Sequence, residues 1–151
     1  MFEFTKLCAR YESLTMLERR ELLTEKSAQV IKNLRQLDIS DIDPIKTLAS
    51  FIIGSVVSGS DIDEKEYLLI YPSLVKVFGY DFDFAQIKKS FYPNQENRKQ
   101  VEKFTKAMLN IMSNLDDEVK ADIISLCLLI ATTDSIISLK TRHYIRQLCK
   151  S

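Results

Sequence analysis

The sequence is poor in the residues that make turns and cross-links. Among its 151 residues are three glycines, three prolines, three cysteines and no tryptophan. β-Sandwiches and β-barrels need many glycine- and proline-rich turns, so this scarcity argues against both and favours helices. The chain also has no net charge, because 21 basic residues balance 21 acidic ones. Nucleic acid is therefore not an expected partner.

The few cysteines and the single histidine give little support for catalysis or for a zinc site. Cys8, Cys127 and Cys149 lie far apart and form no Cys-x-x-Cys pair. We interpret Cys127 as a small apolar core residue and Cys149 as an exposed thiol in a reducing cytoplasm. His143 is expected at the surface, and no nucleophile or phosphate-binding motif accompanies it. We therefore expect a protein that is not an enzyme.

Long hydrophobic runs are missing as well. The longest, residues 48–57 and 123–131, have about ten residues each, whereas a transmembrane helix needs about 20. The first residues have neither the basic start nor the apolar stretch of a secretory signal. We therefore expect a cytoplasmic protein, with both runs in helices at the centre of a bundle.

The sequence does have helical periodicity with recognisable helix starts. It predicts an all-α bundle of about seven helices and no strand, in one domain over residues 1–151. The first long helix is expected over residues 15–37, after a short helical arm. Asp43 followed by Pro44 is typical of an N-cap and first helical residue, and starts the first apolar helix.

The next helix is expected to begin with a capping box formed by Asp63 and Glu66. Its apolar pattern continues through Leu68 and Leu69, and it ends at Gly79. Pro72 lies inside this pattern, so the helix is expected to be kinked or split there.

Two similar segments occur about half a chain length apart. Residues 51–63 and 126–138 each run from an apolar helix through small residues to an isoleucine, Ile62 or Ile137. An Asp or Ser cap then starts a polar helix. Such a repeat predicts two pseudo-symmetric halves around the apolar helices. The halves are expected over about residues 15–92 and 94–150.

This pattern resembles the TerB-like family, small helical proteins linked to tellurite resistance. The family motif is an apolar helix that ends in Ala and Asp-Gly-x-Ile-x-x-x-Glu, often once per half. In the first copy Ile62 and Glu66 match, whereas Gly59 and Ser60 replace the motif's Asp and Gly. The resemblance covers roughly residues 48–77 in this copy.

The second copy covers roughly residues 123–150. Asp134 and Ile137 match the motif, whereas Ser135 replaces Gly and Thr141 replaces Glu. The resemblance implies a cytoplasmic stress-response protein that acts as a non-catalytic protein-interaction module. Its expected partners are other proteins of a metal- or envelope-stress system, including membrane-associated ones.

Acidic residues around the motif are the candidate site for such a partner: Asp61, Asp63, Glu64, Glu66 and Asp134. In the family the acidic motif positions have been proposed to bind metal, which carries over here to Glu66 and Asp134. With Asp61 and Asp63 nearby, these oxygen ligands would suit Ca²⁺ or Mg²⁺, so a divalent-metal-binding protein is the alternative function. The EF-hand pattern is absent because the loop positions lack carboxylates.

The same acids also have a purely structural interpretation. Asp63 would cap a helix, Glu66 would complete the capping box, and Glu64 would stabilise the helix dipole. The sequence leaves open which of the three roles these residues have.

Overall fold

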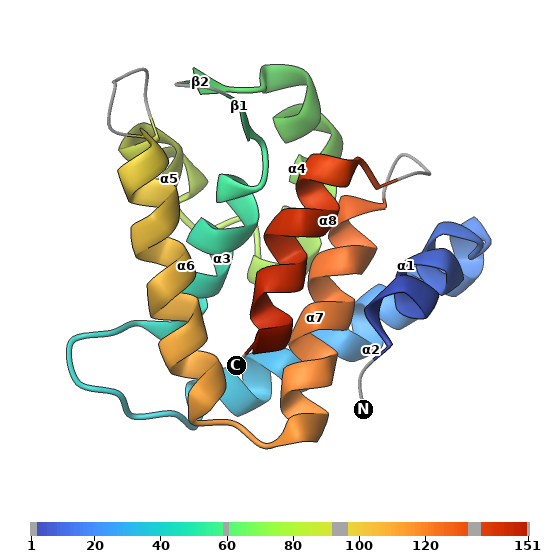
Figure 1. Ribbon diagram of the computed structural model, residues 1–151, viewed down its shortest axis with the longest axis horizontal. Helices are drawn as coiled ribbons and strands as arrows, with labels where there is room; N and C mark the ends of the chain where they lie inside the picture. Colours follow the sequence, from blue (N-terminus) through green and yellow to red (C-terminus); the bar gives the residue numbers. More distant parts are fainter. Residues whose placement is uncertain (1–2, 59–60, 92–96, 133–136, 151) are drawn as a thin grey trace.

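The structure, a computed structural model, describes residues 3–58, 61–91, 97–132 and 137–150 and is mostly helical (Figure 1). Over these residues the chain forms eight α-helices and one short 3₁₀ helix. They are α1 (Phe4–Glu12), α2 (Met16–Arg35), α3 (Pro44–Gly54), α4 (Glu64–Phe78), α5 (Phe84–Ser90), α6 (Asn97–Ser113), α7 (Asp117–Ala131), α8 (Leu139–Arg146) and η1 (Gln147–Lys150). The predicted all-α bundle is confirmed, and the helix beyond the expected seven is the N-terminal arm, α1.

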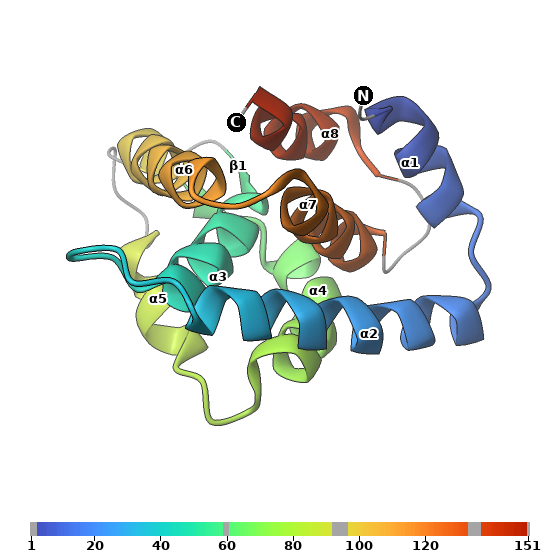
Figure 2. The ribbon, with the colours of Figure 1, turned by 90° about the horizontal axis from the view of Figure 1, so that it is seen from below.

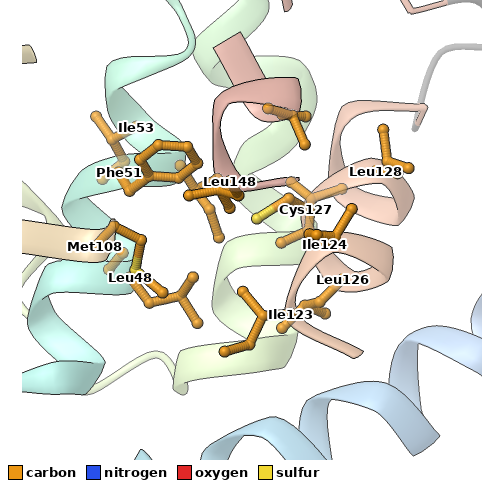
Figure 3. Packing of buried hydrophobic residues seen from close by; sticks show 14 of the residues in the cluster. Leu48, Phe51, Ile53, Met108, Ile123, Ile124, Leu126, Cys127, Leu128 and Leu148 are labelled. Atoms are coloured by element: carbon orange, nitrogen blue, oxygen red, sulfur yellow. The ribbon is translucent and has the colours of Figure 1, made fainter. Parts of the chain in front are cut away.

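The two apolar helices lie in the middle of the bundle, as the sequence predicts. α7 packs between α2 and α8, and α3 packs against α6 (Figure 2). All residues from 47 to 54 in α3 and from 123 to 130 in α7 are buried. Figure 3 shows their side chains meeting those of Met108 and Leu148. A helix with no polar face is stable only inside such a core.

α3 is shorter than predicted because its last turn tightens after Gly54. The amides of Ser55 and Val56 donate to carbonyls three residues earlier, at 3.0 and 3.1 Å. This leaves the Phe51 carbonyl for the Tyr144 hydroxyl, which donates to it at 2.5 Å. The two rings are also stacked, with centroids 4.4 Å apart. α8 thus supplies the cap for the end of α3.

A short antiparallel pair, which the sequence does not predict, follows α3. β1 (Val57–Ser58) pairs with β2 (Asp61–Ile62), and Val57 lies opposite Ile62. Branched side chains at these two positions favour extended backbone. Two residues are too few for the alternation that identifies a strand in a sequence. The pair places the start of α4 beside the end of α3.

Pro72 lies inside α4 but does not split the helix. A proline removes the hydrogen bond to the carbonyl four residues earlier, which here belongs to Leu68. Both residues are exposed, so water can satisfy this carbonyl and the helix continues past the proline. α4 ends at Gly79, as predicted, where φ is +91°, a conformation that favours glycine.

α2 begins with a complete capping box, in agreement with the predicted start at residue 15. The Thr15 hydroxyl accepts from the Glu18 amide at 3.1 Å, and the Thr15 amide donates to the Glu18 carboxylate at 3.0 Å. Further along α2, Lys26 pairs with Asp122 of α7 at 2.7 Å. α2 is therefore fixed to a helix almost one hundred residues later in the sequence.

Other long-range contacts tie the N-terminal helices to the end of the chain. The Glu12 carboxylate on α1 accepts from Arg142 Nη2 and from the Ile137 amide, both at 2.9 Å. Arg19 on α2 donates to the Thr132 hydroxyl, just after α7. Side-chain contacts thus join α1 to α8, and α2 to the end of α7.

Candidate functional site

Asp63, the central residue of the predicted acidic site, is the N-cap of α4. Its carboxylate accepts from the amides of Lys65 and Glu66 at 3.1 and 3.2 Å. The predicted capping box is wrong in its second half, because the Asp63 amide donates to the Val56 carbonyl at 2.8 Å. The β1–β2 pair brings Val56 into this position, so Glu66 is not needed there.

Glu64 forms an ion pair with Lys88 of α5, with Nζ and Oε2 2.8 Å apart. The Lys88 ammonium also lies 4.8 Å from the centre of the Tyr67 ring, a cation–π distance. Glu64 itself is exposed, so the ion pair contributes little to stability. It does hold the start of α4 against α5.

The other predicted site residues are not brought together by anything that the structure describes. Glu66 is half-buried at the start of α4. Asp61 is described only as backbone in β2, and Asp134 lies outside the described residues. Within the described residues, no group of three or more His, Cys, Asp or Glu side chains could hold a metal ion. A Ca²⁺ or Mg²⁺ site at these acids stays a prediction.

The feature that the acidic pattern does not reveal is the outward face of α4. The exposed fractions of Leu68, Leu69 and Tyr71 are 67%, 43% and 38%, and Pro72 is exposed as well. We call these four residues the α4 ridge. Single exposed apolar residues are common, but several on one helical turn are not. The sequence contains the signal, because α4 is apolar on more faces than one buried side requires.

Neighbouring rings hold part of the α4 ridge in place. The Tyr71 ring lies edge-on to Phe84 of α5, with centroids 5.6 Å apart, and 5.8 Å from Tyr67. Glu64 lies one turn before Leu68 and so borders the ridge. The ridge is therefore a preformed apolar surface with a charged edge.

Cys127 and Tyr144 are reactive side chains that lie buried on two neighbouring helices of the bundle, α7 and α8. Burial raises the pKa of the Cys127 thiol to about 12 and also raises the pKa of the Tyr144 hydroxyl, so both stay protonated at neutral pH. They line a cavity of only about 10 Å³, too small for a substrate. His143 and Cys149 are exposed, as predicted.

Comparisons with protein-family models, with curated proteins and with solved structures find nothing that matches this chain. Its function therefore has to be inferred from its own residues. Among the described helices, none combines the length and the apolar character needed to cross a membrane.

Proposed function

We propose that this protein is a non-catalytic protein-interaction module that binds a partner protein on the α4 ridge. The exposure of Leu68, Leu69 and Tyr71 on one turn of α4 carries this proposal. Burying a leucine fully is worth about 1.5–3 kcal/mol, so a partner with an apolar face gains from covering these side chains. The charged edge at Glu64 and Lys65 adds directional contacts around an apolar centre.

The resemblance to the TerB-like family supports the cellular setting of the proposal. On this basis we propose that the module acts in a cytoplasmic stress response of the tellurite-resistance type, with partners that include membrane-associated stress proteins. Among the predicted acids whose side chains the structure describes, exposed Glu64 borders the α4 ridge, one turn before Leu68. Asp63 contributes indirectly, because it caps the helix that carries the ridge.

Site-specific photo-crosslinking in the native cells tests this function. A photoreactive residue replaces Leu68 in one variant and Leu17 in another, since these leucines are exposed almost equally, 67% and 66%. We expect a discrete crosslinked species from position 68 and none from position 17. Adding Tyr71→Asp to the position-68 variant should remove that species.

Two outcomes would contradict the proposal. One is the absence of a crosslink from position 68, and the other is the same crosslinks from both positions. A crosslink that joins two copies of this chain would show that the ridge serves self-association.

A further inference from the structure

A groove with a volume of about 630 Å³ lies between α2 and α4. Figure 2 shows α4 passing close to the long helix α2, which forms the other wall. Ala28, Ile31 and Val77 give the groove an apolar lining. Lys32, Arg35 and Lys76 give it three positive charges, and none of the described residues that line it is acidic.

These three cations are available to a ligand. All three are exposed, and none of them is in an ion pair with another residue that the structure describes. Lys76 Nζ donates a long hydrogen bond, 3.4 Å, to the Arg20 carbonyl, which links α4 to α2 at the end of the groove nearer the start of α2. An apolar lining under unpaired cations is complementary to an amphipathic segment with acidic residues.

We propose that this groove binds an acidic, amphipathic segment of the partner protein, with its carboxylates on Lys32, Arg35 and Lys76. The inference rests on the proposed function, because it names the chemistry of the partner that covers the α4 ridge. Leu69, Pro72 and Lys76 follow one another along one side of α4, so the ridge and the groove form a continuous surface.

The size of the groove suits a short segment. Its α2 wall runs from Thr24 to Gln36, and at 1.5 Å per residue this is about 18 Å. A helix of about 12 residues has the same length. The acids Glu21 and Glu25 are exposed on α2 just before the groove, so negative charge borders the three cations on this side. A nucleic acid or an anionic bilayer would extend over these acids, whereas a short acidic segment would not.

Selection from a phage-displayed library of random 14-residue peptides tests the inference on the full chain. We expect the enriched peptides to be rich in Asp and Glu and to carry apolar residues at helical spacing. Binding of one such labelled peptide, followed by fluorescence anisotropy, should weaken as salt increases, because the Debye length falls from about 10 Å at 0.1 M to about 3 Å at 1 M.

Two triple variants with equal changes in net charge give the matched comparison. The groove variant carries Lys32→Glu, Arg35→Glu and Lys76→Glu. The control carries the changes Lys99→Glu, Lys103→Glu and Lys106→Glu on α6, at positions that are also exposed. We expect the groove variant to bind the peptide at least about tenfold more weakly, because three attractions become repulsions. The control should bind within about twofold of the wild type.

Control measurements distinguish a loss of binding from a loss of folding. Circular dichroism and thermal unfolding verify that each variant is folded, and a milder variant with glutamine at residues 32, 35 and 76 should also weaken binding. Peptides without acidic enrichment, the absence of any enriched peptide, or equal losses in the two triple variants would overturn the inference.

Binding elsewhere would overturn it too. Vesicles of phosphatidylcholine with phosphatidylserine should not bind the wild type more strongly than the groove variant. The wild type should also be monomeric by light scattering. If the selected peptides need Leu68 but ignore the groove cations, the inference fails and the proposed function stands. If crosslinking at position 68 also fails, both fail.

Discussion

At the scale of single residues, the Tyr144 side chain packs so close to Gly54 that it leaves no room for a larger residue there. A Cβ atom on Gly54 would lie 2.7 Å from the Tyr144 hydroxyl oxygen, which is itself held by the Phe51 carbonyl. We expect Gly54→Ala to lower the free energy of unfolding by about 1 kcal/mol, since overpacking costs about 1–3 kcal/mol and the better helix propensity of alanine returns part of it. Urea unfolding measures this change.

Removing the hydroxyl provides the control for this prediction. Tyr144→Phe alone should destabilise by about 1–3 kcal/mol, because the buried Phe51 carbonyl loses its donor. With Tyr144→Phe already present, Gly54→Ala should cost much less than it does alone. Strictly additive changes would show that the two residues are not coupled.

Because the Cys127 thiol is buried, we expect the free energy of unfolding to fall at alkaline pH. Burial raises the pKa of its thiol from 9.0 to about 12, so the folded state holds this proton more tightly than the unfolded state. The resulting stability is fully present below pH 9 and is lost between pH 9 and about pH 12. Between pH 8 and pH 10 the Cys127 contribution should fall by about 1.4 kcal/mol.

The measurement is the difference in unfolding free energy between these two pH values, for the wild type and for Cys127→Ala. The variant is less stable overall but should lose about 1.4 kcal/mol less over this interval. The same pH dependence in both proteins would contradict the assignment to Cys127.

At the scale of elements, the end of α4 depends on the conformation of Gly79. Its φ of +91° and ψ of 150° lie in a region that is essentially reserved for glycine, and open space surrounds its Cα. We expect Gly79→Ala to destabilise by about 1–3 kcal/mol through backbone strain alone. Chemical denaturation measures it, with Ala at the exposed position Ser113 as a helix-end control that should change stability little. An unchanged midpoint for Gly79→Ala would contradict this account.

Helix starts could be predicted from the sequence because a cap and its acceptors lie within three residues. Asp43, Asp63 and Ser138 all cap helices as expected. The end of α3 could not be predicted, because its cap, Tyr144, is 93 residues away. The sequence shows that α4 is apolar on more than one side. Which of these sides stays exposed as the α4 ridge depends on the neighbours of α4, and periodicity alone does not give them.

At the scale of the whole molecule, the roles of the motif acids determine whether its thermal stability depends on a divalent metal ion. Asp63 already accepts two amide hydrogen bonds and Glu64 pairs with Lys88. We therefore expect chelator-stripped protein to unfold at the same temperature with Ca²⁺, Mg²⁺, Mn²⁺ or Zn²⁺. An ion at about 100 times its Kd would add roughly 2.7 kcal/mol, a shift of several degrees. A selective shift that disappears in Glu66→Gln would contradict this expectation.

The bundle itself could be predicted from the two apolar helices, because such helices are stable only when others surround them. Which helices surround them was not predictable, since the pairing of α2 with α7 depends on residues such as Lys26 and Asp122 that lie 96 positions apart. The two pseudo-symmetric halves stay a prediction. The two motif copies do share a local pattern, in which α3 leads to the Asp63-capped α4 and α7 to the Ser138-capped α8.

The pairing of α2 with α7 also has a consequence for the protein during its synthesis. α2 leaves the ribosome long before α7 exists, and at 5–20 residues per second the delay is roughly 5–20 s. Throughout this interval α2 lacks α7, the helix with which it makes its most extensive contact, and has α3 and α4 to pack against. The nascent chain thus exposes apolar surface of α2 to chaperones and to aggregation until α7, which ends at Ala131, has been made.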